Sequence, residues 1–284
     1  MTTHESLAIE VQRLTKHYGD NAAVDEIDLQ VFSGEIFALL GPNGAGKSTT
    51  VEMLEGFRRP TSGIIKVLGH NPASVNMAWR DRIGVVLQSG SLEEECTVQE
   101  LLALTATYYR NPRSVSEAIA LVGLQEKTNA RVGSLSGGQQ RRVDVALGII
   151  GRPELLFLDE PTTGFDPEAR RQFWDLIRLL RSEGTTIVLT THYLDEAEVL
   201  ADRVGVIVRG RMIEVASPKD LGGRATAQSV VHWQTAEGPQ SLTTPSPTQT
   251  IAELAQGFGG EIPELRVLRP SLEDIYLSMI GDPQ

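Results

Sequence analysis

The stretch from residue 41 to residue 49 limits the possible folds of this chain more than any other feature. It matches the phosphate-binding loop pattern G-x-x-x-x-G-K-[ST] in full. An apolar run, residues 36–40, precedes it, and a helical pattern over residues 50–54 follows. The motif therefore lies in the strand-loop-helix context that it requires. Its nine residues are Gly41, Pro42, Asn43, Gly44, Ala45, Gly46, Lys47, Ser48 and Thr49.

The residue types in this loop suit a triphosphate. Glycines let successive backbone N–H groups approach an anion, and the helix that starts near Lys47 adds the partial positive charge of its N-terminus. Lys47 is expected to neutralise the β- and γ-phosphates, and the Ser48 hydroxyl to bind Mg²⁺. A plain glycine-rich turn would not require lysine and serine at these positions. We therefore predict a nucleotide site.

Length and composition narrow the class of protein. The chain has 284 residues, of which 40% are hydrophobic, so it can form one large or two unequal domains with an α/β core. The net charge of -11 and the pI near 5.0 argue against a nucleic-acid partner, although they do not exclude a local basic groove. The lone Cys96 and the absence of a secretory signal suit the cytoplasm. No apolar run approaches the roughly 18 residues that span a bilayer, so a membrane role would need a partner.

Strand patterns dominate much of the first 220 residues. Apolar and polar residues alternate over 7–14 and 23–31 around a turn signal at 18–21, which predicts an antiparallel pair. The run 155–158 is apolar throughout and is expected inside a parallel sheet. The other strands predicted after the phosphate-binding loop are residues 63–69, 83–87, 186–190, 204–208 and 212–215.

Helical patterns interrupt these strands. Periodicity over 98–109, 115–122 and 139–150, with no strand between, predicts a helical insertion at about 89–150. A further helix is expected over 167–181. The first domain should therefore be α/β, with a parallel core sheet, an N-terminal antiparallel β subdomain and a helical insertion.

A small C-terminal subdomain is also expected. Gly222-Gly223 marks a break, which predicts domains over 1–222 and 223–284. Ser271 is expected to start a last helix that can pack on its own subdomain or on a second copy. The signals for an α+β unit are apolar alternation at 230–233 and 262–268 and helical spacing at Ile251, Leu254 and Phe258.

Two carboxylates, Asp159 and Glu160, directly follow the apolar run 155–158. Open α/β sheets bind ligands at the carboxyl ends of their strands. We assign Asp159 to Mg²⁺ and Glu160 to the attacking water. An acidic pair could instead be solvated or cap the next helix. That helix already has Asp166 as its N-cap and Pro167 as its first residue, so capping is less needed.

Other candidate residues carry weaker signals. Residues 135–139, Leu-Ser-Gly-Gly-Gln, lie just before a helix and form a second candidate anion site, although Ser-Gly-Gly is also a common turn. A lone His192 after an apolar strand would more often have a structural role, and Tyr18 would more often be a turn aromatic. Arg141 and Arg142 could attract phosphate, but a solvated helix face is the favoured interpretation.

The order of these motifs resembles the nucleotide-binding subunits of ABC transporters, over residues 7 to about 220. The resemblance implies a P-loop NTPase fold of the RecA-like type, ATP and Mg²⁺ as cofactors, and ATP hydrolysis. It also implies two partners, a separate transmembrane permease and a second copy of the chain. The protein would then lie on the cytoplasmic face of the membrane through its permease.

The resemblance further implies roles for individual residues. Tyr18 corresponds to the aromatic residue that stacks on adenine, and Asp166 lies in the D-loop. Gln88 corresponds to the glutamine that links the metal site to the membrane partner, and His192 to the switch histidine. Ser136, Gly137, Gly138 and Gln139 belong to the signature, which closes on the γ-phosphate held by the other copy. The implied catalytic residues are Glu160, His192 and Gln88, and the implied metal ligands are Ser48, Gln88 and Asp159.

The tail, residues 270–277, resembles the C-terminal extension of the drug-resistance branch of ABC ATPases. This implies a daunorubicin-type exporter of drug-like or lipophilic compounds. A soluble ABC ATPase acting on ribosomes or DNA stays an alternative, although such relatives usually carry two domains or a coiled-coil insertion. A GTP-driven switch is disfavoured because no Asn-Lys-x-Asp segment occurs. A binding module with a decayed site is disfavoured because every candidate catalytic position is filled.

Overall fold

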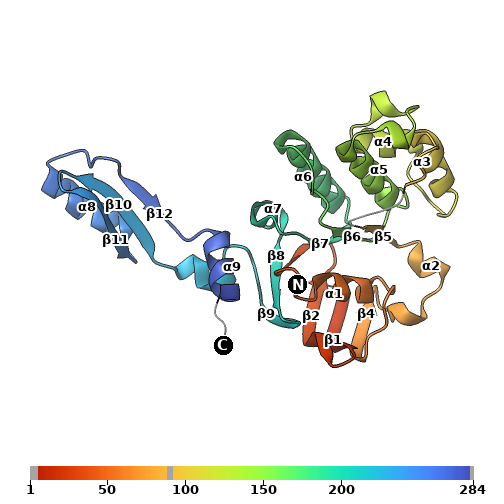
Figure 1. The fold of residues 1–284 in the computed structure, drawn as a ribbon, viewed down its shortest axis with the longest axis horizontal. Helices are drawn as coiled ribbons and strands as arrows, with labels where there is room; N and C mark the ends of the chain where they lie inside the picture. Colours follow the sequence, from red (N-terminus) through yellow and green to blue (C-terminus); the bar gives the residue numbers. More distant parts are fainter. Residues whose placement is uncertain (1–5, 88–91, 282–284) are drawn as a thin grey trace, which may run out of the picture. The chain divides into compact units, whose positions relative to one another are not determined.

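The computed structural model describes residues 6–87 and 92–281 (Figure 1). The contacts within the chain divide it into two compact units, Met1–Val215 and Ala216–Gln284. Gly222 and Gly223 lie in the second unit, in a 3₁₀ segment Leu221–Thr226, with φ of 59° and 71°. The domain limits 1–222 and 223–284 stay a prediction.

A six-stranded sheet in the order β5-β6-β7-β3-β8-β9 organises the first unit. The pairings of β5 with β6, β6 with β7, and β3 with β7 and β8 are parallel, as predicted. Because β6, β7 and β3 are neighbours, their carboxyl ends meet at one edge of the sheet. The six strands are β3 (Ile36–Leu40), β5 (Ile83–Val86), β6 (Leu155–Asp159), β7 (Thr186–Thr190), β8 (Arg203–Val208) and β9 (Arg211–Ala216).

The predicted antiparallel pair is confirmed. β1 (Leu7–Tyr18) and β2 (Asn21–Phe32) pair around a turn at residues 19–20, and β4 (Ser62–Val67) pairs with the other side of β1. Apolar side chains of this second sheet share one buried core with α1 (Lys47–Leu54) and the central sheet. The phosphate-binding loop is therefore anchored on both sides by packed elements.

The predicted helical insertion is present. α3 (Val98–Ala106), α4 (Val115–Leu121) and α5 (Gly137–Ile149) pack against one another, as Figure 1 shows. Capping boxes open α3 and α5, which explains where both helices start. The remaining helices of this unit are α2 (Met77–Arg80), α6 (Pro167–Ser182) and α7 (Leu194–Leu200).

The helix α6 begins and packs as its sequence indicates. Asp166 is its N-cap and accepts a hydrogen bond from the N–H of Ala169 at 2.8 Å, and Pro167 is its first residue. Phe173, Leu176, Ile177 and Leu180 are buried, at the i, i+3, i+4 and i+7 spacing of one helix face. This helix directly follows the segment that carries the two candidate acids.

The second unit is α+β, as predicted. Its described residues form a three-stranded antiparallel sheet, β11-β10-β12, with α8 packed on β10. Ser271 starts α9, because its Oγ accepts the N–H of Asp274 at 3.1 Å, and α9 packs on the 3₁₀ segment of its own unit. The elements are β10 (Ser229–Thr235), β11 (Gly238–Thr244), α8 (Pro247–Phe258), β12 (Arg266–Leu268) and α9 (Leu272–Gly281).

Candidate phosphate-binding and catalytic site

The loop 41–49 connects the carboxyl end of β3 to α1 and needs glycine for two reasons. Gly46 is the N-cap of α1 with a φ of 104°, and a Cβ there would lie 2.4 Å from the carbonyl oxygen of Ala23. A Cβ at Gly41 would lie 2.3 Å from the carbonyl oxygen of Ile207. The helix α1 has no side-chain cap, so the N–H groups of its first turn suit an anion.

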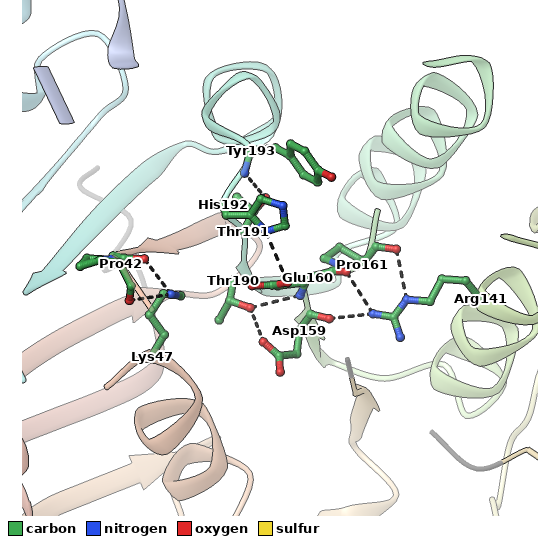
Figure 2. A network of polar contacts seen from close by, with 11 residues as sticks. Pro42, Lys47, Arg141, Asp159, Glu160, Pro161, Thr190, Thr191, His192 and Tyr193 are labelled. Carbon is green, nitrogen blue, oxygen red and sulfur yellow. Dashed lines mark hydrogen bonds and ion pairs between the residues drawn. The ribbon is translucent and has the colours of Figure 1, made fainter. Parts of the chain in front are cut away.

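Lys47 lies inside this loop. Its Nζ donates hydrogen bonds to the carbonyl oxygens of Gly41 at 2.7 Å and Pro42 at 3.2 Å, and the residue is only 8% exposed. Burial lowers the pKa of Lys47, and the negative charges of Glu160 and Asp159 act in the opposite direction. Both acids are therefore close enough to Lys47 for their charges to act on it. Figure 2 shows the hydrogen bonds of Lys47 to carbonyl groups of its own loop.

Asp159 ends β6 and is held by the neighbouring strand. The strand register places it opposite Thr190, whose Oγ1 donates a hydrogen bond to Oδ1 of Asp159. The same Thr190 accepts the N–H of Glu160, at 3.1 Å through its carbonyl oxygen and at 3.2 Å through Oγ1. One threonine, 1% exposed, thus fixes the segment that carries both acids.

Glu160 has an uncommon backbone conformation. Its φ is 46°, in the left-handed region, which costs a residue other than glycine about 1 kcal/mol or more. Its carboxylate Oε2 lies 3.4 Å from Nδ1 of His192. His192 packs on the ring of Tyr193 with 4.0 Å between ring centroids, and its side chain is 46% exposed. The structure thus brings together two of the predicted catalytic residues from the ends of two strands.

The interpretation of Arg141 as a solvated residue is wrong. Its side chain is 8% exposed and reaches from α5 to the segment after β6. The guanidinium donates hydrogen bonds to the carbonyl oxygens of Asp159 at 2.7 Å, Glu160 at 3.3 Å and Pro161 at 3.2 Å (Figure 2). Helical periodicity did not reveal this, because the partners are backbone atoms of another segment.

Arg142 differs from its neighbour, because it is only half-buried. It donates hydrogen bonds to the carbonyl oxygen of Val122 at 3.3 Å and to Oε1 of Gln172 at 3.0 Å. These contacts tie α5 to the end of α4 and to α6. Arg142 also borders a pocket beside the signature.

The signature residues lie at the start of α5, apart from the phosphate-binding loop. Ser136 Oγ accepts the N–H of Gln139 at 3.3 Å, and Gln139 Oε1 accepts the N–H of Ser136 at 3.1 Å. A Cβ added at Gly137 or Gly138 would meet nothing within 4 Å. This open surface borders a pocket of about 640 Å³ that also includes Gly164, Phe165 and Asp166.

The pocket beside the signature does not include the phosphate-binding loop. Among the described residues that border it, none belongs to the loop 41–49. Asp166 is the N-cap of α6 as predicted, and it also faces this pocket. The signature and D-loop thus share one pocket, apart from the loop that carries Lys47.

Tyr18 lies at the end of β1 and is 43% exposed. Two cations are near its ring, with Lys16 Nζ and the guanidinium carbon of Arg58 each 5.3 Å from the ring centroid. Such an exposed aromatic face can stack on a planar base. The predicted Gln88 lies outside the described residues.

Thr190 is a residue of the candidate site that the sequence signals missed. It is the last residue of the predicted strand 186–190 and looks like an ordinary β-branched strand residue. Its role depends on the register between β6 and β7, which sequence patterns did not provide.

Sequence and structure comparisons identify similar proteins. The family described as ABC transporter matches residues 24–163. The Nod factor export ATP-binding protein I of Rhizobium etli is 40% identical over 301 residues, which covers 96% of this chain and 93% of that protein. The daunorubicin/doxorubicin resistance ATP-binding protein DrrA of Streptomyces peucetius is 43% identical over 226 residues, which covers 78% of this chain and 68% of that protein.

Two solved structures have a similar fold. One is an ATP-binding subunit of an ABC transporter, with a TM-score of 0.70 and 28% identity, covering 76% of this chain and 92% of that chain. The other is the dimeric, post-hydrolysis state of an ATP-binding cassette bound to ADP and Pi. It has a TM-score of 0.67 and 25% identity, and the match covers 74% of this chain and 98% of that chain. The predicted P-loop NTPase fold is confirmed.

Proposed function

This chain belongs to the ATP-binding subunits of the ABC transporter family, and from this membership we propose that it hydrolyses ATP to drive export through a separate membrane permease. The observation that carries the proposal is the convergence of Lys47, Asp159 and Glu160 at one edge of the central sheet. In the family, ATP hydrolysis powers transport, and the predicted ATPase class is confirmed.

The loop and the two acids suit a nucleotide with Mg²⁺. The N–H groups of the first turn of α1 and Lys47 would hold the β- and γ-phosphates. Mg²⁺ usually takes one or two protein oxygen ligands and completes its shell with phosphate and water. The exposed Ser48 hydroxyl and the Asp159 carboxylate supply such oxygens, and Thr190 holds Asp159 in place.

Glu160 and His192 would act on the attacking water and the γ-phosphate. Glu160 is assigned the task of orienting the water, because its carboxylate follows the metal-binding position by one residue. His192 lies 3.4 Å from this carboxylate and would contact the γ-phosphate. Tyr18 would stack on adenine through its exposed ring.

We further propose that two copies enclose two ATP molecules. The support is the open surface at Gly137 and Gly138, which is separate from the loop of the same chain. Ser136, Gly137 and Gly138 of one copy would close on the γ-phosphate held by Lys47 of the other. A dimeric cassette with ADP and Pi is among the similar solved structures.

Export of lipophilic or drug-like compounds is the transport direction that we propose. The relatives named above are described by Nod factor export and by daunorubicin and doxorubicin resistance. Action on ribosomes or DNA has less support, because neither relative is described by such a role. Within residues 6–87 and 92–281, no helix is both long and apolar enough to cross a bilayer. The permease would hold the protein at the cytoplasmic face of the membrane.

The test compares two variants of the purified full-length chain. Glu160→Gln should still bind ATP but lower turnover by roughly 10²–10⁴-fold, because a positioned acid-base group is lost. Lys47→Ala should instead weaken ATP binding or hydrolysis, because a charged phosphate ligand is lost. Turnover is measured by phosphate release and binding by a fluorescent ATP analogue. Wild-type turnover in Glu160→Gln would refute the assignment of Glu160.

A further inference from the structure

Arg141 is buried on α5, the helix that the signature opens, yet its partners lie on other segments. Its guanidinium carries a full positive charge with only 8% of the side chain exposed. Burial lowers the pKa of Arg141, and the carboxylates of Asp144, Asp159 and Glu160 oppose this. A buried charge is costly unless it is paired and hydrogen-bonded. The contacts of this side chain therefore need an explanation.

The carbonyl oxygens of three consecutive residues converge on this guanidinium. They belong to Asp159, Glu160 and Pro161, at 2.7, 3.3 and 3.2 Å. A fourth carbonyl oxygen, that of Leu87 just after β5, accepts a hydrogen bond from Nη1. The fork of donors in arginine suits this arrangement, because it can reach several acceptors at fixed angles.

The acidic partner of Arg141 is more distant. Oδ2 of Asp144 lies 3.8 Å from Nη1 of Arg141, beyond hydrogen-bond distance. Asp144 is one turn further along the same helix, so its charge offsets that of Arg141 without fixing the 159–161 segment. The carbonyl contacts of Arg141 therefore determine the backbone geometry of residues 159–161.

The three carbonyl groups flank the residue with unusual backbone. Glu160 has a φ of 46°, a conformation that persists in residues other than glycine only when the surroundings hold it. Thr190 holds this residue from one side through the N–H of Glu160, and Arg141 holds it from the other side through the carbonyl oxygens. Figure 2 shows the two sets of contacts on opposite sides of the segment.

We propose that Arg141 is a positioning residue for Glu160, in which the guanidinium holds the left-handed turn at residues 159–161 and so directs the Glu160 carboxylate. This inference rests on the proposed function of Glu160. Arg141 touches no reacting group and acts only through the backbone that carries the acid. Its removal should therefore lower the rate of hydrolysis while leaving ATP binding at Lys47 intact.

The test uses a matched pair of variants of the full-length chain. Asp144→Asn removes the ionic partner but keeps the carbonyl contacts. Arg141→Met combined with Asp144→Asn removes the carbonyl contacts without leaving a buried carboxylate unpaired. Arg141→Lys keeps the charge but has fewer donors and no planar fork. It should therefore retain part of the activity that the double variant loses. Arg178→Gln, which changes an exposed arginine on α6, is the surface control.

The first measurement is steady-state ATP hydrolysis. The double variant should lower kcat roughly 10- to 100-fold with KM for ATP within about twofold, because a small misplacement of a catalytic group has an effect of this size. Asp144→Asn and Arg178→Gln should stay within about twofold of wild type. In a Glu160→Gln background the double variant should cost less than about threefold, because the residue being positioned is absent. Equal losses in both backgrounds would overturn the proposal.

The second measurement does not require turnover. Hydrogen exchange in peptides that cover residues 157–165 should accelerate about tenfold or more in the double variant and in neither control, because the turn loses its carbonyl partners. Unchanged exchange in a folded double variant would overturn the proposal. A wild-type chain without any ATP hydrolysis would refute the proposed function, while the exchange result would still decide whether Arg141 holds the turn.

Discussion

Thr190→Val tests whether a single hydroxyl aligns the Asp159 carboxylate, which we propose binds Mg²⁺. Valine keeps the volume and β-branching of threonine, so the buried strand position stays filled. The substitution removes the hydrogen bond from Oγ1 to Asp159 and the one that Oγ1 accepts from the N–H of Glu160. That N–H keeps its bond to the carbonyl oxygen of Thr190 at 3.1 Å, so it stays paired.

Two magnitudes follow from these contacts. Loss of a hydrogen bond to a charged group should lower the free energy of unfolding by about 1.5–3 kcal/mol. Asp159 would also lose its fixed orientation. Mutation of a residue that orients a metal ligand usually lowers metal affinity by roughly 10- to 100-fold. The Mg²⁺ concentration for half-maximal hydrolysis should therefore rise by this factor.

Thr186→Val is the matched control because Thr186 lies at the other end of the same strand. Its Oγ1 accepts the N–H of Gly34 at 2.9 Å and has no contact with either acid. This variant should lose about 0.5–1.5 kcal/mol of stability and keep the Mg²⁺ dependence of wild type. The assay is phosphate release against Mg²⁺ concentration at saturating ATP, with stability from urea unfolding. The same Mg²⁺ dependence in both variants would refute the role of Thr190.

Three further predictions address the phosphate-binding loop, the stacking of adenine and the pH dependence of stability. Gly46→Ala should lose more than about 2 kcal/mol of stability, because the new Cβ would meet the carbonyl oxygen of Ala23. Gly44→Ala should lose about 1 kcal/mol, because Gly44 has a φ of 78° but lies in open space. Thermal unfolding measures both losses, and equal losses would contradict this prediction. Tyr18→Ala should weaken ATP binding by about 1–3 kcal/mol and Tyr18→Phe hardly at all, because stacking on the base uses the aromatic ring. Titration with a fluorescent ATP analogue measures both affinities. An equal loss in both variants would show that the hydroxyl, and not the ring, contributes to binding. Burial, with the charges of Asp159 and Glu52, raises the pKa of Glu55 to about 8. Since the folded-state pKa exceeds the ordinary value of 4.5, the free energy of unfolding should fall as pH rises from about 4.5 to about 8. Urea unfolding should therefore show Glu55→Gln gaining roughly 3–4 kcal/mol of stability relative to wild type between pH 5 and pH 8. A constant difference would refute this.

The sequence alone predicted the elements that local signals define. The phosphate-binding loop has fixed residue types at fixed positions, because backbone geometry allows only glycine at Gly41 and Gly46. The N-cap Asp166 is equally local, since it needs only the N–H of Ala169. The apolar runs of β3, β6 and β7 predicted inner strands, because both faces of a parallel sheet are covered.

Elements with weak local signals were missed. The strand β11, GPQSLTT, is mostly exposed and polar, and it forms a strand because β10 pairs with it. The helix α2, with four residues, is too short to show clear periodicity. The seven-residue helix α7 was also missed, although α4, of the same length, was predicted. For β11, pairing with β10 decides the local structure.

By itself, the sequence determined the chemistry available to this protein: a loop for phosphate, two acids after a buried strand and a histidine after another. Only the tertiary structure decided which residues hold these groups in place. Thr190 faces Asp159 through strand register, and Arg141 reaches across from α5 to backbone oxygens that no side-chain pattern reveals. The physical reason is that these contacts join segments far apart in the chain, and their partners are set by how the strands and helices pack.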